Sequence, residues 1–481
     1  GVGYFDTVTT AAGLYKNYVW VDTYGYLGYG TRGVVAFDAD NDGFMDLLGV
    51  NWGPVETRKE VPWITPAQPN EYYHNNGDNT FTKRDDTGLT HPENPSHMGT
   101  QGVTAADVNN DGWMDIFICH RNYAYLGKTP AGSDSFGVGP IPTPNQLLIN
   151  DGSGHFVDET QVRGLYDAGN DANGATFADF DNDGDLDLFV PPKDITVRKL
   201  KIYENDGRGY FTDISTRIRI DQWGFSPILG DFNNDGYLDL FVSRSYGTSA
   251  IYLNTGAGNF SLQGVAGVET AAYDPRGGGL ADIEGDGDLD IYYVDANKDM
   301  RARYSNRLFR NDTPRTNHWL KVTGRGPKGD AGGFGTKIWL FEAGAMDDME
   351  RLVGYRQVMN TYGYLCQDDP VQHFGLGSRT AVDVKVRFLD GTELSMAGVA
   401  ADRKIIFTRP QQMILHSGDG QNGSSGQALA HPLQVKVTDS QGRPVRGAAV
   451  HWTALSGGST FQPGVVTRTG ADGIASVTCI P

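Results

Sequence analysis

The sequence predicts an all-β protein whose main part repeats a unit of four short strands. Three observations lead to this prediction. A nine-residue acidic loop recurs five times, short apolar runs surround each copy, and the 481 residues include 64 glycines and 11% aromatic residues. An internal repeat of this kind, with a period near 40 to 50 residues, is typical of sheets arranged radially in a β-propeller.

The recurring loop carries side-chain oxygen at positions 1, 3, 5 and 9 and glycine at position 6. Its five copies, here named loops 1 to 5, read DADNDGFMD from Asp38, DVNNDGWMD from Asp107, DFDNDGDLD from Asp179, DFNNDGYLD from Asp231 and DIEGDGDLD from Asp282. Together with the main-chain carbonyl of position 7, these oxygens are the donors with which proteins surround Ca²⁺. Glycine at position 6 permits a turn that a Cβ atom would obstruct.

The sequence therefore predicts about five Ca²⁺ sites. Their expected ligands, at positions 1, 3, 5, 7 and 9, are Asp38, Asp40, Asp42, Phe44, Asp46, Asp107, Asn109, Asp111, Trp113, Asp115, Asp179, Asp181, Asp183, Asp185, Asp187, Asp231, Asn233, Asp235, Tyr237, Asp239, Asp282, Glu284, Asp286, Asp288 and Asp290. Ca²⁺ is favoured over Mg²⁺, which retains its water ligands and demands a tight octahedron. An ion-free acidic turn is disfavoured, because the three or four ligand carboxylates of each loop would repel one another.

The surroundings of the loops exclude an EF-hand. An EF-hand requires a bidentate glutamate at position 12 and a helix on each side. Position 12 is occupied by Gly49, Ile118, Val190, Val242 and Tyr293. The apolar residues that follow position 9 are rich in β-branched and aromatic types, which predicts buried strands. Each loop therefore connects two strands.

A hairpin signature follows each of the first four loops and completes the four-stranded unit. An apolar run, a turn of the Asn-x-Gly or Asn-Asp-Gly type and a run that begins with an aromatic residue start near residues 70, 145, 201 and 250. The loops begin 69, 72, 52 and 51 residues apart. The first two repeats therefore contain insertions, which we place at 52–69 and 120–144.

The insertions are the predicted partner-binding segments. Aromatic side chains with a few polar groups suit sugar stacking or a protein interface. The candidates are Trp52, Trp63, Tyr72 and Tyr73 around the first insertion and His120, Arg121, Tyr123 and Tyr125 at the second. The alternative is that these residues cover sheet edges. No HExxH or GxSxG motif is present, so no catalytic residue is predicted.

The composition limits the classes of partner and the compartment. The formal charge of −19 leaves no basic stripe for nucleic acid, and no apolar run approaches the length of a membrane span. Three cysteines, Cys119, Cys366 and Cys479, form no CxxC motif. Because weak calcium sites fill only where free calcium is high, the protein is expected outside the cell or on its surface.

The repeats resemble FG-GAP (VCBS) repeats, the calcium-binding propeller blades also found in integrin α heads, over about residues 30–312. The segments NHWLKVTGRGPKGDAGGFGTKIWLF from Asn317 and GYLCQDDPVQHFGLG from Gly363 are similar to the ASPIC/UnbV module, placed at about 313–410. This resemblance implies two further blades, so residues 1–410 would form a seven-bladed β-propeller.

The last segment, 411–481, resembles the bacterial immunoglobulin-like Big-1 domain of invasin type. Its predicted strands alternate with Asp-Ser-Gln-Gly and Ala-Asp-Gly turns. The resemblance implies an Ig-like β-sandwich that lacks its last strand, and the natural chain is expected to continue beyond Pro481.

Three functional hypotheses follow. The first is a non-enzymatic, secreted or surface-attached bacterial protein that acts as a calcium-dependent adhesion, interaction or assembly module and binds protein or carbohydrate at the cell surface. The second is a propeller enzyme acting on carbohydrate, of the polysaccharide lyase or sugar dehydratase type. The third is a self-assembling subunit of an extracellular filament or surface layer. Family resemblance favours the first, although fold alone does not fix function.

Overall fold

The computed structural model confirms the all-β class. It describes residues 31–51, 70–78, 80–89, 100–120, 144–167, 172–192, 200–220, 224, 227–242, 247–256, 258–263, 271–272, 275–295, 306–313, 316–325, 333–359, 369–409, 411–439, 442, 444–445, 448–454, 459–462 and 464–481. Within these ranges the only helical elements are α1, Ser215–Ile218, and the 3₁₀ turn η1, Met349–Arg351. None of the helices described has the length and hydropathy that a membrane span requires.

Five successive antiparallel sheets carry the five loops. Their strands, in chain order, are β1 Thr31–Phe37, β2 Asp46–Asn51, β3 Glu71–Asn75 and β4 Phe81–Arg84; β5 Thr100–Ala106, β6 Asp115–His120, β7 Gln146–Asn150 and β8 Phe156–Asp158; β9 Thr176–Ala178, β10 Asp187–Val190, β11 Lys201–Asn205 and β12 Phe211–Asp213; β13 Pro227–Gly230, β14 Asp239–Val242, β16 Ala250–Asn254 and β17 Phe260–Gln263; and β19 Pro275–Ala281, β20 Asp290–Asp295 and β21 Arg307–Phe309. A two-stranded ribbon pairs β15 Gly247–Thr248 with β18 Ala271–Ala272.

Each sheet is a meander in which neighbours in sequence are neighbours in space. The loop always joins the first strand to the second, so position 9 of each loop is the first residue of its second strand. The predicted unit of strand, loop, strand and hairpin is therefore confirmed, with four described strands in repeats 1 to 4 and three in repeat 5.

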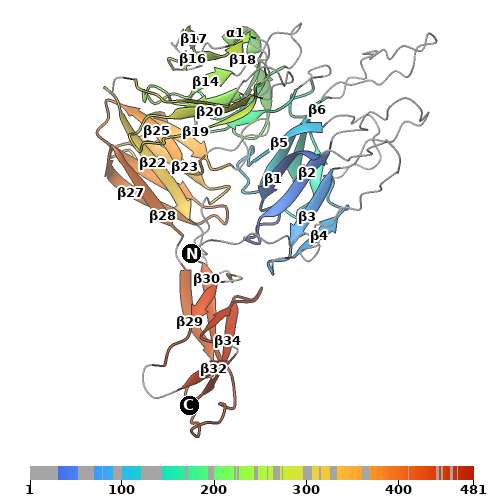
Figure 1. Cartoon of the computed structure of the whole chain (residues 1–481), viewed down its shortest axis with the longest axis vertical. Helices are drawn as coiled ribbons and strands as arrows, with labels where there is room; N and C mark the ends of the chain where they lie inside the picture. The colour runs from blue at the N-terminus through green and yellow to red at the C-terminus, as the bar shows by residue number, and fades with distance from the viewer. Residues whose placement is uncertain are drawn as a thin grey trace, which may run out of the picture.

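The sheets follow one another along an arc and pack face to face. In Figure 1 they run in chain order from blue at the right, over green at the top, to yellow at the left. The first strands β1, β5, β9, β13 and β19 lie side by side in succession. The hydrophobic clusters of the repeats lie between adjacent sheets. Val35 and Ile116 share one cluster, for example, and Phe241 and Tyr293 share another. Burial of apolar surface between neighbours thus holds each sheet in place.

Residues 318–408 form a unit of different topology. Its strands are β22 His318–Arg325, β23 Lys337–Glu342, β24 Leu352–Gln357, β25 Gln372–Gly377, β26 Ala381–Arg387, β27 Glu393–Ala400 and β28 Arg403–Thr408. They build one sheet of order β25-β22-β28 and one of order β24-β23-β26-β27, around a single core that includes Leu320, Val384 and Phe374. Because β22 pairs in parallel with β28, this order differs from the meander of the repeats. The count of seven blades stays a prediction.

The 318–408 unit lies against the loops of the repeats. The N–H group of Asp107 in loop 2 donates to Oε1 of Gln357 at 3.1 Å. Gly377 N donates to the carbonyl of Asn234 in loop 4 at 2.8 Å, and His373 Nε2 to that of Gly287 in loop 5 at 2.8 Å. Segments far apart in sequence thus share one interface.

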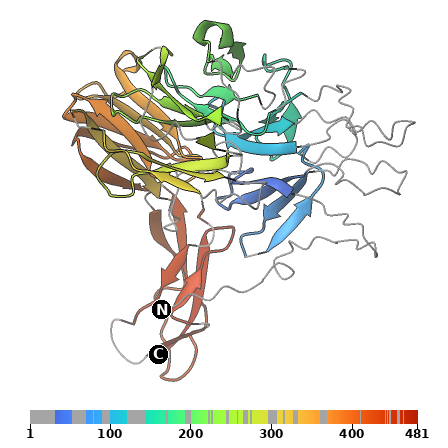
Figure 2. The same cartoon turned by 45° about the horizontal axis from the view of Figure 1, so that its top comes forward.

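The C-terminal strands are β29 Gln411–Ser417, β30 Leu433–Asp439, β31 Ala449–His451, β32 Thr460–Gln462, β33 Val466–Arg468 and β34 Ile474–Ile480. They form a sheet of order β29-β30-β34-β32 and a pair β31-β33 that share a small core around Val437, Val450 and Ala475. Figure 2 shows these red strands projecting from the rest of the molecule. The Ig-like sandwich and the boundary at 410/411 stay predictions.

Candidate metal centres

Main-chain hydrogen bonds hold the carboxylate at position 1 of every loop. In loop 1, Asp38 accepts the N–H of Asp42 through Oδ1 at 3.1 Å and the N–H of Gly43 through Oδ2 at 2.8 Å. The equivalent pair of bonds is present in the other four loops. Each loop therefore curls around its first carboxylate.

The residue at position 4 turns the loop through the left-handed region. Asn41, Asn110, Asn182 and Asn234 have φ between 54° and 62°, and Gly285 has φ of 75°. Asparagine and glycine are the residues that tolerate this conformation, which explains their recurrence at this position.

The same asparagines connect neighbouring loops. Nδ2 of Asn41 donates to the carbonyl of Gly112 at 3.1 Å, and Nδ2 of Asn182 donates to that of Gly236 at 3.0 Å. Asn234 makes the equivalent bond to Gly287 at 3.2 Å. In loops 1, 3 and 4, position 4 therefore contacts position 6 of the next loop, whereas Asn110 of loop 2 donates to Gly207 in the hairpin of the next repeat at 3.1 Å.

The carboxylate at position 9 is fixed from two sides. In repeat 4, Oδ2 of Asp239 accepts the N–H of Phe232 at position 2 at 2.9 Å, and Oδ1 accepts the N–H of Asn254 at 2.8 Å. An asparagine at or just after the end of the third strand donates its N–H in this way in all five repeats, and these residues are Asn75, Asn150, Asn205, Asn254 and Asn311.

The side chain of this asparagine also ties adjacent repeats together. Nδ2 of Asn254 donates to Leu238 O of its own loop at 3.2 Å and to Phe180 O of the preceding loop at 2.7 Å. Asn150 and Asn205 make the same two bonds, and Asn311 makes the bond to the preceding loop. The sequence analysis treated these residues as turn formers only. Their recurrence at one place in five repeats was the available signal for this second role.

Carboxylates converge within the loops. In loop 3 one oxygen each of Asp179, Asp181 and Asp187 lies within 4.8 Å of the others. The equivalent positions of loop 5, occupied by two aspartates and Glu284, form a similar group. Asn109 and Asn233, at position 3 of loops 2 and 4, instead donate Nδ2 to the carboxylate at position 5.

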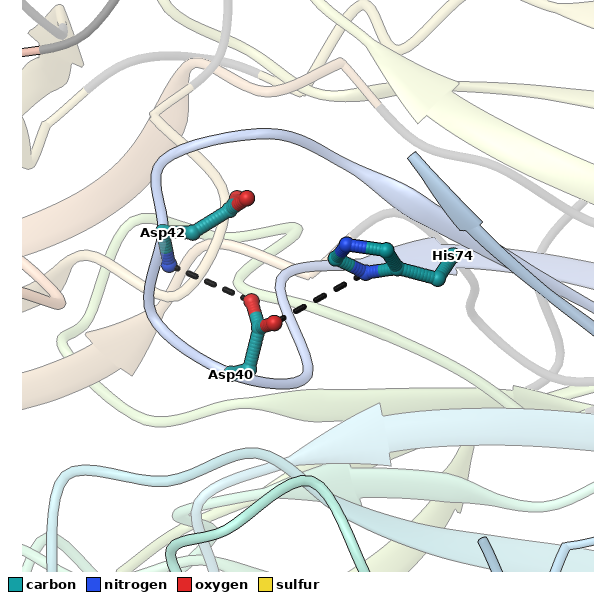
Figure 3. A group of neighbouring side chains, drawn as sticks. All are labelled: Asp40, Asp42 and His74. Atoms are coloured by element: carbon teal, nitrogen blue, oxygen red, sulfur yellow. Dashed lines mark hydrogen bonds and ion pairs between the residues drawn. The ribbon is translucent and has the colours of Figure 1, made fainter. Parts of the chain in front are cut away.

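Loop 1 gains a nitrogen donor from the adjacent hairpin. His74, on β3, points toward Asp40 and Asp42, as Figure 3 shows. Its Nδ1 lies 3.7 Å from Oδ2 of Asp40 and 3.2 Å from Oδ1 of Asp46. Imidazole nitrogen is a ligand that Zn²⁺ and other transition metals accept readily. His74 directly precedes Asn75, and the residues that precede the corresponding asparagines of the other repeats are Ile149, Glu204, Leu253 and Arg310. The other four loops therefore have no histidine at this position.

Burial and mutual repulsion raise the pKa of several loop carboxylates. Desolvation, with smaller contributions from neighbouring carboxylates, raises the pKa of Asp42 and of Asp181 to about 6 and that of Asp185 to about 8. The same two causes raise the pKa of Asp239 to about 9. Ionisation of these carboxyl groups is therefore unfavourable without a metal, and a bound cation would favour the release of their protons.

The oxygen atoms of loop 3 also fit a hard cation. Oδ1 of Asp181 and Oδ1 of Asp185 are buried and have no hydrogen-bond partner, and Asp185 is only 7% exposed. Leaving a buried acceptor unsatisfied costs about 1–3 kcal/mol. The donor set consists of oxygen atoms, which Ca²⁺ prefers. The residues present thus fit Ca²⁺, with positions 1, 3, 5 and 9 and the carbonyl of position 7 as its expected ligands.

The predicted partner-binding residues divide into two groups. Trp52, Trp63, Arg121, Tyr123 and Tyr125 lie outside the described residues. Tyr73 is half-buried on β3. In contrast to the expectation of a surface role, Tyr72 is 2% exposed and its hydroxyl donates to Asp46 Oδ2 at 2.8 Å, while His120 is 1% exposed and bonds Gln146 at 2.9 Å. Both side chains point inward because they lie at buried strand positions.

A cavity lies between loops 3 and 5 and the 318–408 unit. Asp179, Asp282, Lys321, Arg356 and His373 are among the residues that line it. Lys321 is paired with Asp282, and His373 donates to the main chain of loop 5. Arg356 donates from Nη1 to Tyr355 O and lies 5.0 Å from the centre of the Phe374 ring. The contacts of Lys321 and His373 join the 318–408 unit to loop 5, whereas these two contacts of Arg356 lie within the unit.

The two cysteines that the structure describes are buried. Cys119 and Cys479 are free thiols in β6 and β34. Cys366 lies outside the described residues.

Family comparisons agree with the repeat structure. Residues 58–118, 133–190, 195–242 and 231–293 match the FG-GAP-like repeat. Residues 326–413 match the ASPIC and UnbV domain. The chain therefore contains FG-GAP-like repeats followed by an ASPIC/UnbV domain, as the sequence analysis expected.

Among curated proteins, the chain is similar to cartilage acidic protein 1. The Homo sapiens protein is 29% identical over 312 residues, which cover 62% of this chain and 42% of the human protein. The Xenopus tropicalis protein is 28% identical over 309 residues, covering 61% and 42%. The matched region thus spans less than half the length of these relatives.

Among solved structures, AofleA from Arthrobotrys oligospora is similar with a TM-score of 0.32 and 10% identity, covering 79% of this chain and 87% of that one. The V. cholerae biofilm matrix protein Bap1 is similar with a TM-score of 0.29 and 10% identity, covering 95% and 82%.

Proposed function

We propose that this protein is a calcium-binding, extracellular interaction module without enzymatic activity. The observation that carries the proposal is the geometry of loop 3, where the carboxylates of Asp179, Asp181 and Asp187 converge and Oδ1 of Asp181 is buried without a hydrogen-bond partner. A divalent cation supplies the positive charge and the coordination that these atoms lack.

Calcium acts structurally in this proposal. The loop joins the first two strands of its sheet, and the asparagine that fixes position 9 also bonds the preceding loop in repeats 2 to 5. A cation that draws the carboxylates of one loop together therefore stabilises both its own repeat and the contact with the previous one. Binding to the folded state alone stabilises it by about 2.7 kcal/mol per site at a hundredfold excess over the Kd.

The proposed architecture is a β-propeller whose ring is completed with the help of the 318–408 unit, followed by an Ig-like domain. Radial packing leaves the outer strands of a propeller free to meet a partner. The relatives are named for cartilage, a tissue made largely of extracellular matrix. This name supports an extracellular location for the protein, where calcium is abundant. A protein or carbohydrate partner at the cell surface or in the surrounding matrix fits this location.

Thermal unfolding with and without calcium tests the proposal. Protein freed of metal by EDTA and dialysed should melt at a lower temperature than protein in millimolar CaCl₂, and MgCl₂ should restore little of the difference. The variant Asp187→Asn, which weakens a loop 3 ligand, should lose part of the calcium-induced gain. Asp206→Asn changes an exposed carboxylate of the adjacent hairpin and serves as the matched control. Identical melting curves in EDTA and CaCl₂ would refute a structural role for calcium.

A further inference from the structure

Loops 2 and 5 differ from the other loops because a lysine of the 318–408 unit contacts each of them. Nζ of Lys337 lies 2.8 Å from Oδ2 of Asp107 and 2.5 Å from Oδ1 of Asn110. Nζ of Lys321 forms an ion pair with Oδ2 of Asp282. Asp107 and Asp282 both occupy position 1, the carboxylate around which the loop curls.

Both lysine contacts are buried. The side chain of Lys337 is 6% exposed and that of Asp107 is 1% exposed, while the corresponding values are 14% for Lys321 and 2% for Asp282. A buried ammonium group needs a carboxylate partner, because an unpaired charge away from water is strongly unfavourable. Each lysine is therefore committed to its loop for as long as the 318–408 unit stays docked.

The lysines use the same oxygen atoms that a cation would need. Oδ2 of Asp107 accepts the N–H of Gly112 at 2.9 Å in addition to Lys337, and Oδ1 accepts the N–H of Asp111 at 3.1 Å. The acceptor positions of this carboxylate are thus largely taken. A Ca²⁺ ion entering the loop would also be repelled by the ammonium charge, since like charges a few ångströms apart in a protein interior interact by several kcal/mol.

Loops 1, 3 and 4 show the contrasting arrangement. At position 1 they have Asp38, Asp179 and Asp231, each of which accepts two main-chain N–H groups. Within the described part of the chain, no lysine pairs with these three carboxylates. Burial raises the pKa of all three and neighbouring carboxylates add to the rise, while the charge of Arg356 acts to lower the pKa of Asp179 and Asp231. For Asp282, burial acts in the same direction, but the hydrogen bond and charge of Lys321 together with the main-chain hydrogen bonds from Gly287 and Asp286 outweigh it, so its pKa is lowered.

We propose that Lys337 and Lys321 act as built-in substitutes for the cation in loops 2 and 5, so that divalent ions bind in loops 1, 3 and 4. This inference rests on the proposed calcium function for those three loops. It lowers the expected number of ions from about five to three, because in loops 2 and 5 a lysine already neutralises the carboxylate at position 1, including Asp282 of the converging group in loop 5. The 318–408 unit then has an electrostatic role, because its lysines neutralise the carboxylates of Asp107 and Asp282 in the repeats on which it packs.

Calcium stoichiometry tests the proposal. Metal-free full-length protein is dialysed against CaCl₂, and bound calcium per chain is measured by atomic emission. We expect three ions in the wild type, four in Lys337→Met, four in Lys321→Met and five in the double variant. Methionine retains the apolar stem of lysine without its charge. Lys385→Met removes a lysine that pairs with Asp347 and Glu393 away from the loops, and should leave three ions bound.

Terbium luminescence gives a second readout that works on the wild type. Trp113 is at position 7 of loop 2, and the indole of Trp319 lies against Gly287 of loop 5. Tb³⁺ replaces Ca²⁺ at oxygen sites and emits when a nearby aromatic ring is excited. Gly112, next to Trp113, contacts loop 1, and Gly287, beside Trp319, contacts loop 4. Ions in loops 1 and 4 should therefore give the wild type a baseline emission on excitation that only tryptophan absorbs. Lys337→Met should gain emission, and adding Trp113→Phe to that variant should abolish the gain.

The outcomes separate this proposal from the one on which it rests. Five calcium ions in the wild type would overturn the role of the lysines while leaving calcium binding intact. No bound calcium in the wild type would refute the calcium function itself. Three ions in the wild type and no additional bound calcium in either folded lysine variant would show that something other than the lysines prevents calcium binding in loops 2 and 5. This result would also overturn the proposal.

Discussion

Replacing Asn254 by alanine tests whether the recurrent asparagine holds adjacent repeats together. Its side chain is fully buried and makes three hydrogen bonds. Nδ2 donates to Phe180 O at 2.7 Å and to Leu238 O at 3.2 Å, and Oδ1 accepts the N–H of Gly256 at 3.0 Å. The main-chain N–H of residue 254, which holds Asp239, remains in the variant.

The expected destabilisation follows from these three bonds. A hydrogen bond contributes about 1 kcal/mol net, and burying the groups left without partners adds to the loss. Asn254→Ala should therefore lower the free energy of unfolding by at least about 3 kcal/mol. Because none of the three bonds involves a cation, the loss should be similar in EDTA and in CaCl₂.

Urea unfolding monitored by intrinsic fluorescence measures this loss. Asn259→Ala is the matched control, since Asn259 lies in the same hairpin but is exposed and donates one side-chain bond, to Gly256 O at 2.9 Å. We expect the control to change stability by less than about 1 kcal/mol. Equal effects of the two substitutions, or an Asn254→Ala effect below about 1 kcal/mol, would refute the assigned role.

Three further predictions concern the 318–408 unit and loop 1. Gly375→Ala would place a Cβ 2.0 Å from Asp231 Oδ2 and should loosen the docked unit, detected as faster proteolysis, whereas Gly464→Ala meets no atom within 4 Å and should have no effect. Burial lowers the pKa of His373 to about 4. The unfolded chain therefore binds more protons than the folded chain between about pH 6.5 and 4, so stability is lost as the pH falls. In urea unfolding, the stability advantage of the wild type over His373→Gln should shrink by about 3 kcal/mol across that window. His74→Leu should weaken competition of Zn²⁺ with Ca²⁺ at loop 1 and leave calcium stoichiometry unchanged, measured by dialysis against both ions, and undiminished competition would exclude His74 as a ligand.

The sequence predicted the repeats because their pattern is local. The acidic residues, the glycine at position 6 and the apolar run after position 9 lie within a dozen residues, and each has a physical requirement that its neighbours share. Asn254 shows where this reasoning stopped. An asparagine two residues before a glycine forms a good turn, so its spacing gave no reason to look for the bond to Phe180 in the preceding repeat.

The docking of the 318–408 unit could not be predicted in the same way. Lys337 pairs with Asp107, and Gln357 with the same residue, although both lie more than two hundred positions later in the chain. Such contacts depend on how complete sheets pack, and no periodicity in the sequence records them. The parallel pairing of β22 with β28 likewise joins the two ends of the unit, a pairing that the expectation of two further blades did not include.

Diffraction from crystals grown with calcium would test the central claim most directly. Anomalous differences measured at long wavelength locate Ca²⁺ without reference to its ligands. The account predicts peaks between positions 1 and 9 of loops 1, 3 and 4, with lysine nitrogen against Asp107 and Asp282 in loops 2 and 5. Absence of a peak from loop 3, where Oδ1 of Asp181 and Oδ1 of Asp185 lack hydrogen-bond partners, would contradict it.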